Sequence, residues 1–487
     1  MAERNDYRLY IDGEWVAPAG GYYDVINPAD ESVVGQAPEA SRDQVYAAAA
    51  AAKAAFPSWS RTKPEERAEI LHRAADIIGK HADEYAVIAQ AETGATTATV
   101  KSLQVNVAVQ RFRRYAKGAL EPVEIPLPPT VSESTPLSKG GLTGALVVRQ
   151  PVGVVTCITS YNNPWANPAG KIAPALAMGN TLLVKPAPQN PLSVFKMTEA
   201  LEEAGLPAGV VNVVSGASIE VGEATVDSPD VDMISFTGST QVGRAIGAVA
   251  GGQMKRVLME LGGKGAAIVF DDADIAAAIG AIGTTFSFYA GQICTAPTRV
   301  YAQRSVYEQV VQGLAGYAKA LKVGDPTALD TVVGPVISAA HRDRIEGYVA
   351  SGRSDGAELV AGGERPDLDK GFYVAPTLFA GAGNDMTIVR EEIFGPVVAV
   401  VPFDDEDEAI AFANDSDYGL INYVWSADVA RGYRVARQLR SGTVDLNTVT
   451  QQMEAPFGGF KQSGVGRDRG SFGLYAYSEL QSIVWPS

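Results

Sequence analysis

Short apolar runs alternate with helical stretches along most of this chain. Runs that are rich in β-branched residues and bounded by Gly, Pro or Asn predict buried strands. Strands that alternate with helices predict a parallel, doubly wound sheet with helices on both of its faces. The first series of such strands is expected at residues 153–158, 181–184, 210–214 and 233–236, with a helix over 193–204.

A second α/β series begins near Gly265. Its strands are expected at 266–270, 397–401 and 442–446. Ahead of the first series, the pattern predicts an Ala-rich helix over 42–55 and an amphipathic helix over 64–92 that is stopped by Gly94. The predicted fold class is therefore α/β, with two doubly wound parallel-sheet domains.

Two segments fall outside this alternation. The Pro-rich segment 121–136 cannot be the interior of a helix, and it is expected to be extended and to begin an arm. The acidic run 404–408 fits either a cation site or a solvated helix start, and the helix start is favoured because early acidic residues suit the helix dipole.

Composition excludes several classes of partner. The 487 residues are 46% hydrophobic, which is enough for a large core, and the formal net charge is -16. This charge opposes binding to nucleic acid and to anionic membranes. Two cysteines cannot form a disulfide framework, three scattered histidines give no metal site, and the amino terminus lacks the features of a signal peptide. A cytoplasmic protein is expected.

Cys294 is the strongest candidate for chemistry. It lies in an uncharged stretch, 288–297, and a thiolate is the best nucleophile that a side chain offers. The other cysteine, Cys157, lies within a β-branched run and is best interpreted as a small core residue.

Two features indicate an anionic ligand, but each has a structural alternative. The turn 236–243 follows a predicted strand, and there Gly238 permits close approach while Ser239 opens a helix whose N–H groups suit a phosphate. A structural Ser cap at the start of a helix alone explains the sequence of this turn, and no G-x-G-x-x-G fingerprint is present in it. Lys185 ends a buried strand, where it either holds ribose or phosphate or reaches the surface along a sheet edge.

Two polar residues are candidate catalytic groups. Glu260 has apolar neighbours that raise the pKa of a carboxylic acid into the range of a general base, although pairing with Lys264 is an equal alternative. The Asn162 amide suits an oxyanion donor, but an Asx turn before Pro164 explains it without catalysis.

The joint occurrence and order of these features resembles the aldehyde dehydrogenase superfamily, and the match extends from Leu9 to near Ile483. The motifs that carry the resemblance are Asn162, Lys185, the turn 236–243, Glu260, Cys294, Glu-Glu-Ile-Phe-Gly-Pro at 391–396 and Pro-Phe-Gly-Gly-Phe-Lys-Gln-Ser-Gly at 456–464.

The resemblance implies NAD(P)-dependent oxidation of an aldehyde to a carboxylic acid. Cys294 would attack the carbonyl, and the Asn162 amide and the Cys294 N–H would hold the thiohemiacetal oxyanion. Glu260 would then activate water to hydrolyse the thioester. The cofactor contacts implied by the match are Ser160, Tyr161, Lys185, Gly222, Phe236, Thr237, Gly238, Ser239, Val242, Leu261, Gly262, Glu392 and Phe394. No metal is implied.

Two departures from the family pattern concern specificity. Pro188 stands where many NAD-preferring members have a Glu that repels a 2′-phosphate, so NAD is predicted with NADP as the alternative. Pocket positions that are often bulky and apolar are polar or small here, which suggests a wider or more polar tunnel. None of these positions is Arg or Lys, so a carboxylated aldehyde has no obvious anchor, although Lys171, Arg299 and more distant positions stay open. The pocket residues expected are Asn163, Asn167 and Gly170 on one wall and Tyr289, Ile293 and Thr295 on the other.

The resemblance also implies domain limits and an assembly. Residues 1–120 and 151–260 would bind the cofactor, 261–465 would form the catalytic domain, and 121–150 with 466–487 would form a β oligomerisation arm and C-terminal strand. A homodimer or homotetramer is expected. Three alternatives stay open: a CoA-acylating member of the family, an unrelated cysteine hydrolase, and a homologue that has lost its activity.

Overall fold

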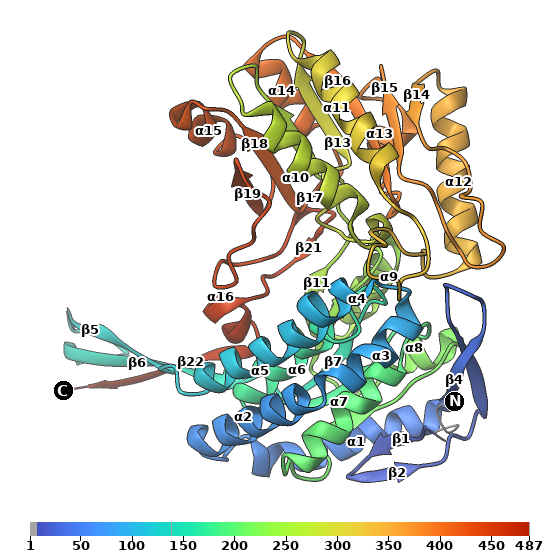
Figure 1. The fold of residues 1–487 in the computed structure, drawn as a ribbon. Helices are drawn as coiled ribbons and strands as arrows, with labels where there is room; N and C mark the ends of the chain where they lie inside the picture. The colour runs from blue at the N-terminus through green and yellow to red at the C-terminus, as the bar shows by residue number, and fades with distance from the viewer. Residues whose placement is uncertain (1–6, 138, 487) are drawn as a thin grey trace.

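The computed structural model describes residues 7–137 and 139–486. It contains two large sheets, and the first lies in the lower part of the molecule in Figure 1. Its strand order is β2-β1-β9-β8-β7-β10-β11-β21. The central strands are parallel, whereas β1 and β21 add at the edges in antiparallel fashion. The strands are β1 (Leu9–Ile11), β2 (Glu14–Val16), β7 (Val154–Ile158), β8 (Thr181–Lys185), β9 (Val211–Val213), β10 (Met233–Thr237), β11 (Arg256–Glu260) and β21 (Gly464–Val465).

Helices cover both faces of this sheet, which explains why its strands are apolar at nearly every position. Along β8, Leu182 and Val184 pack into one core while Leu183 packs into the other. One face is covered by α1 (Arg42–Trp59), α8 (Ile219–Asp227) and α9 (Thr240–Gly252). The opposite face is covered by α2 (Pro64–Lys80), α3 (Ala82–Thr93), α5 (Asn106–Gly118), α6 (Ala166–Ala177) and α7 (Leu192–Glu203).

The second sheet has the order β14-β15-β16-β13-β12-β18-β19 and is parallel except for β14. Its strands are β12 (Ala266–Val269), β13 (Arg299–Gln303), β14 (Glu358–Ala361), β15 (Thr377–Ala380), β16 (Val397–Phe403), β18 (Ile421–Trp425) and β19 (Thr443–Leu446). One face packs on α10 (Ile275–Ser287) and α11 (Tyr307–Ala320). The other packs on α12 (Ala339–Ser354), α13 (Thr387–Arg390), α14 (Glu406–Asn414) and α15 (Val429–Ala436).

Each large sheet with its helices is called a body below. A three-stranded antiparallel sheet projects away from the two bodies (Figure 1). It contains β5 (Glu124–Ser132), β6 (Gly141–Pro151) and β22 (Ser478–Pro486). The predicted fold class is confirmed, with two α/β sheets and a β arm. Smaller elements are the hairpin β3 (Tyr22–Ile26) and β4 (Val33–Pro38), the pair β17 (Tyr418–Gly419) and β20 (Phe460–Lys461), and the short helix α16 (Gly470–Tyr475).

The expected helix over 64–92 is wrong as a single element. It is broken at His81, whose backbone (φ -99°, ψ 15°) leaves the helical region between α2 and α3. The two pieces pack on different partners, α2 mainly on α5 and α3 mainly on a π-helix at Val100–Val105 that follows α4 (Thr97–Thr99). The periodicity of the sequence does not indicate such a change of direction.

Among the described residues, no helix combines the length and the apolar character that a membrane span requires.

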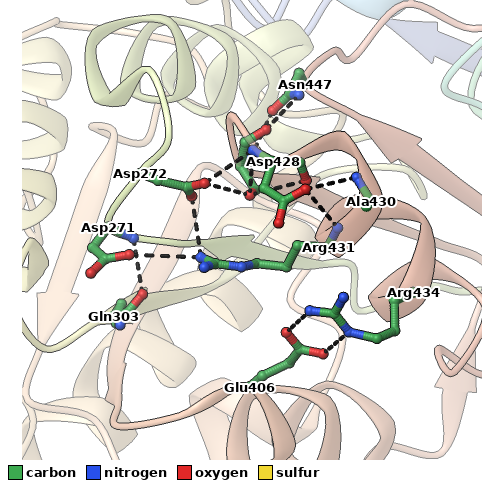
Figure 2. Close-up of polar contacts among 10 residues, drawn as sticks. Asp271, Asp272, Gln303, Glu406, Asp428, Ala430, Arg431, Arg434 and Asn447 are labelled. Carbon is green, nitrogen blue, oxygen red and sulfur yellow. Dashed lines mark hydrogen bonds and ion pairs between the residues drawn. The ribbon is translucent and has the colours of Figure 1, made fainter.

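The acidic run 404–408 begins a helix, as predicted. Asp405 is the N-cap of α14, and its carboxylate accepts from the Glu408 N–H at 2.9 Å. Figure 2 shows Glu406 paired through both carboxylate oxygens with Arg434 of α15. Asp404 is likewise paired through both carboxylate oxygens with Arg304. The acids therefore serve helix capping and two bidentate ion pairs.

Candidate active site

Polar groups gather where the parallel strands of the first sheet reach their carboxyl ends. Strand β7 leads into Ser160–Asn162, β8 ends at Lys185, β10 ends at Thr237, and β11 ends at Glu260. In open α/β sheets, ligands bind in the crevice at this edge. The topology therefore brings the residues singled out in the sequence to one cleft.

Cys294 lies in a loop whose backbone is strained just before the cysteine. It follows a 3-10 turn, Phe288–Gly291, in which Tyr289 and Ala290 have φ values of 53° and 52°. Such left-handed conformations are costly for residues with a side chain and are held by their surroundings. A Cβ atom on Gly263 would lie 2.3 Å from the Cys294 carbonyl oxygen, so the Glu260–Lys264 segment packs directly on this loop.

The Cys294 thiol is protonated at rest. Desolvation in the cleft, with the nearby carboxyls of Glu392 and Glu260, raises the pKa of Cys294 to about 12. The cysteine is nevertheless partly exposed, whereas Cys157 is buried inside the sheet. Only Cys294 is therefore positioned to meet a ligand from solvent.

The Asn162 side chain is held in one orientation by three hydrogen bonds. Its Oδ1 atom accepts from Ser160 Oγ at 2.8 Å and from Asn167 Nδ2 at 3.3 Å. Its Nδ2 atom donates one hydrogen to the Gln292 carbonyl, two residues before Cys294, at 2.9 Å. One amide hydrogen remains for a ligand, and Asn167, expected in the pocket wall, acts here on Asn162.

Glu260 is buried, and neither carboxylate oxygen has a hydrogen-bond partner among the described residues. Burial, followed by the charge of Asp468, raises the pKa of Glu260 well above its usual value, against the opposing effect of Lys171. The suggested Glu260–Lys264 pair does not form, because the Lys264 amine is itself buried with no hydrogen-bond partner in the described part of the chain. An unpaired carboxyl in this position is available for proton transfer.

Lys171 and Arg299 are not free to anchor a substrate. Lys171 is buried and donates to Ser235 Oγ at 3.1 Å. Arg299 is buried in the second body, where its guanidinium donates to the carbonyl oxygens of Lys264, Phe412 and Ala413.

A second group of residues lies between α8 and α9 beside the end of β8. The Lys185 amine is buried and makes only a long contact, 3.4 Å, with the Pro186 carbonyl. A Cβ atom on Gly222 would lie 4.0 Å from Lys185 Cε, an ordinary van der Waals distance, so Gly222 packs beside this lysine. Val242 of α9 is 47% exposed. An apolar surface beside a partly satisfied amine fits an adenosine unit.

The turn before α9 is arranged as the sequence predicted. Ser239 caps α9, and its Oγ accepts from the Val242 N–H at 3.3 Å. Phe236 is buried below the turn, and a Cβ atom on Gly238 would lie 2.4 Å from its ring. Thr237 and Gly238 are partly exposed at the mouth of the turn.

Glu392 closes the cleft from the second body. Its Oε1 atom accepts from the Gly263 N–H at 2.8 Å, and a Cβ atom on Gly262 would lie 2.3 Å from Oε2. Gly262 is therefore required for this approach, while Leu261 is buried against Gly243. Phe394 has a φ of 58°, and its ring meets Tyr161 edge-on at 5.9 Å between centroids.

The remaining pocket residues lie in different environments. Tyr289 is buried in the core below the first sheet, and Ile293 packs against the same core. The Thr295 carbonyl accepts from the Tyr423 hydroxyl at 2.7 Å, and Asn163 is partly exposed. Gly170 lies against the side chain of Arg111, which no sequence pattern indicated. A Cβ atom on Gly170 would lie 2.0 Å from Arg111 Nη1.

Arg111 and Arg469 are further candidates that no motif or pattern in the sequence identified. Arg111 lies on α5, a helix that the pattern did not predict, and Arg469 lies just before α16. Burial, then the charge of Arg111, lowers the pKa of Arg469 to about 10, and Cys294 and Glu260 lie within its electrostatic range. Only the packing of α5, α6 and α16 brings these two side chains to the site.

Comparison with known proteins agrees with this geometry. A family model described as "Aldehyde dehydrogenase family" matches residues 15–483. Betaine aldehyde dehydrogenase of Bacillus subtilis is 38% identical over 98% of this chain and 96% of its own length. A 3-succinoylsemialdehyde-pyridine dehydrogenase of a Pseudomonas species is 39% identical over 98% of both chains.

The structural match is equally complete. An aldehyde dehydrogenase from Bacillus cereus, solved as an NAD+ complex, superimposes with a TM-score of 0.93 at 37% identity, over 99% of this chain and 97% of the other. The relatives act on different aldehydes at nearly equal identity, so likeness at this level does not select a substrate. A match of this extent, in sequence and in structure alike, shows that the chain belongs to the aldehyde dehydrogenase family.

Proposed function

We propose that the protein oxidises an aldehyde to a carboxylic acid with NAD, using Cys294 as nucleophile, Asn162 as oxyanion donor and Glu260 as general base. One observation carries the proposal: Glu260 is a buried carboxyl with no partner among residues 7–137 and 139–486, in a cleft that also holds a cysteine and an oriented amide. A buried carboxyl without a hydrogen-bond partner costs folding free energy, so such a group persists where it has a function.

Each residue has a separate task. The Cys294 thiol releases its proton to solvent as the sulfur adds to the aldehyde carbon, and the free Asn162 N–H donates to the oxygen as that oxygen becomes negative. Departure of a hydride from this adduct gives the thioester. The bonds from Ser160 and Asn167 fix the amide beforehand, so no reorganisation is needed at that moment. Glu260 then takes a proton from water as the water attacks the thioester, which releases the acid and the Cys294 thiol.

The cofactor-binding residues fit a nicotinamide dinucleotide. The incompletely satisfied Lys185 amine and the Glu392 carboxyl suit the hydroxyls of two riboses, and the exposed start of α9 suits the pyrophosphate. When bound, NAD supplies the hydride acceptor for the oxidation. The chain's own contribution is to hold and orient the ligand between Val242, Gly222 and Phe394.

Glu39 supports a preference for NAD over NADP despite Pro188. Its carboxylate accepts from the N–H groups of Ala217 and Ser218, at 2.6 and 3.1 Å, at the start of α8. Although burial lowers the pKa of Lys185 to about 8, Glu39 acts on that lysine in the opposite direction. A 2′-phosphate near Lys185 would meet this negative charge, so Glu39 performs the exclusion that Pro188 cannot.

Glu39→Gln is expected to raise the ratio of kcat/KM for NADP to that for NAD by about tenfold, the effect of removing one like charge. Initial rates with both cofactors at fixed aldehyde concentration measure the ratio. Glu220→Gln is the matched control, because Glu220 lies on α8 but pairs with Arg42 at the surface. An unchanged ratio in Glu39→Gln would assign the exclusion to another residue.

Asn162→Ala is expected to lower kcat by about 100- to 1000-fold, the usual effect of deleting one oxyanion donor. The rate at which iodoacetamide alkylates Cys294 should change far less, because the amide acts after sulfur has attacked. Stopped-flow turnover and alkylation rates are compared in the same preparation. A parallel loss of both rates would mean that Asn162 only supports the loop.

The arm is proposed as the interface of a homodimer or homotetramer. Its strands expose apolar side chains at positions 125, 127, 131, 142, 480 and 483–485, and a partner subunit would cover them. The proposed domain limits follow the same division, although β21, within 261–465, adds to the first sheet. A cytosolic location is proposed because Cys157 and Cys294 are both free thiols.

A panel of aliphatic, aromatic and terpenoid aldehydes with NAD and NADP, followed by nicotinamide absorbance, tests the proposed function. Product analysis with and without CoA separates hydrolysis from acyl transfer, and the unpaired Glu260 favours hydrolysis. The absence of turnover on every aldehyde would favour a homologue that has lost its activity. Ester cleavage that needs no cofactor would favour the cysteine hydrolase.

A further inference from the structure

Arg111 enters the cleft in the space left by a small residue on α6. A Cβ atom on Gly170 would overlap Arg111 Nη1 at 2.0 Å, so only glycine admits the guanidinium here. The Nη1 atom donates to the Ala166 carbonyl at 2.6 Å. The next arginines on α5 behave differently, because Arg113 pairs with Asp76 and Arg114 with Glu121 and Glu454. Arg111 is directed toward Gly170 and has no carboxylate partner among the residues that the structure describes.

Arg469 lies within electrostatic range of Arg111, Cys294 and Glu260. Its guanidinium carbon lies 4.0 Å from the centre of the Phe457 ring, which fixes the side chain by a cation–π contact. The Nε atom is buried and lacks a hydrogen-bond partner among the described residues. The backbone has a φ of 69°, a left-handed conformation that residues other than glycine adopt only when the surroundings impose it.

The charges around these arginines favour an anion. Asp468 accepts through one carboxylate oxygen from the Arg469 backbone N–H at 2.7 Å, and Asp445 Oδ2 is buried with no hydrogen-bond partner within the described ranges. Burial raises the pKa of Asp445 to about 6 and that of Glu260 well above its usual value. Arg111 lowers the pKa of Arg469 and Asp468 raises it, so the acids offset the repulsion between the two guanidinium groups only in part.

We propose that Arg111 and Arg469 form a subsite for the carboxylate of an aldehyde that carries an acid group at its far end. The inference rests on the proposed function, because it places the tail of the substrate whose aldehyde group meets Cys294. A carboxylate accepts from two guanidinium groups in a well-defined geometry, and the unpaired Arg469 N–H provides one donor. The substrate class is that of the dicarboxylic semialdehydes.

Matched substrates test the subsite. The wild-type enzyme is assayed with 4-oxobutanoate, 5-oxopentanoate and 6-oxohexanoate, with their methyl esters, and with hexanal. We expect kcat/KM for the best acid to exceed that of its ester by about 10- to 100-fold, the range for a charge-assisted hydrogen bond. A preference for the ester or for hexanal would overturn the inference while leaving the proposed function intact. No turnover of any aldehyde would overturn the proposed function itself.

Substitutions locate the effect. Arg111→Met and Arg469→Met are each expected to lower the acid-to-ester ratio by at least about tenfold, and Arg111→Lys should restore part of it. Arg113→Met is the matched control on the same helix, and its ratio should stay at the wild-type value. Ratios unchanged in both methionine variants would overturn the subsite.

A binding measurement avoids dependence on turnover. Calorimetry with Cys294→Ala protein and succinate, glutarate or adipate should detect binding that weakens at least about tenfold when Arg111→Met is added. Equal binding in the two proteins would contradict the inference. Thermal denaturation of each variant distinguishes loss of the subsite from loss of the fold.

Discussion

Cys294→Ala is expected to abolish aldehyde oxidation, with kcat lower by about 10⁴-fold or more, as for other nucleophiles that form the covalent intermediate. Without the sulfur, the aldehyde carbon cannot become the tetrahedral adduct from which a hydride leaves. The loop itself should persist, because the Gly263 and Gly291 contacts involve backbone atoms. Nicotinamide absorbance at saturating aldehyde measures the loss.

Cys157→Ala is the matched control. Cys157 is fully buried in β7, and burial raises the pKa of its thiol to about 12. We expect its kcat to stay near the wild-type value, with a loss of about 1 kcal/mol in the free energy of unfolding from the vacated sulfur volume. Activity that survives in Cys294→Ala but fails in Cys157→Ala would contradict the assignment of the nucleophile.

Glu260→Gln is expected to stop the reaction after its first half. The amide keeps the size of the carboxyl but cannot take a proton from water, so the thioester accumulates. Stopped-flow absorbance should show a burst of about one reduced nicotinamide per active site, followed by turnover about 100- to 10,000-fold slower than wild type. Mass spectrometry of the quenched protein should find the acyl group on Cys294.

The pH dependence of the wild-type enzyme follows from the same carboxyl. Burial and Asp468 raise the pKa of Glu260, so the group is protonated and inactive as a base at low pH. Wild-type kcat should therefore rise with pH as Glu260 loses its proton, over a higher range than for an exposed glutamate. This limb should vanish in Glu260→Gln. A variant without a burst, or one that keeps the limb, would move the base to another residue.

The strands were the most predictable part of the fold. Those expected at 153–158, 181–184 and 233–236 appear as β7, β8 and β10 with ends shifted by at most one residue. Their β-branched runs are bounded by Gly, Pro and Asn, which end a strand whatever surrounds it. The break at His81 was not predictable, because the residues on both sides keep a helical pattern and only their packing partners differ.

The candidate site also has a part that the sequence predicts and a part that it does not. Cys294, Glu260 and Asn162 could be proposed as catalytic residues because their residue types and order form a family motif, and the expectation that Asn167 lines the pocket came from position alone. The structure adds that Asn167 donates to Ser160 Oγ and Asn162 Oδ1. Hydrogen-bond geometry of this kind depends on rotamers, which a sequence does not specify.

The sequence by itself determined the fold class, the family and the residues proposed for the chemistry, since these depend on local periodicity and on motifs of fixed order. The tertiary structure decided which distant side chains meet there. Arg111 reaches the cleft because α5 packs on α6 at Gly170, and Arg469 because α16 packs on α5. These contacts join segments with no common motif, and they set the charge of the pocket and with it the proposed substrate.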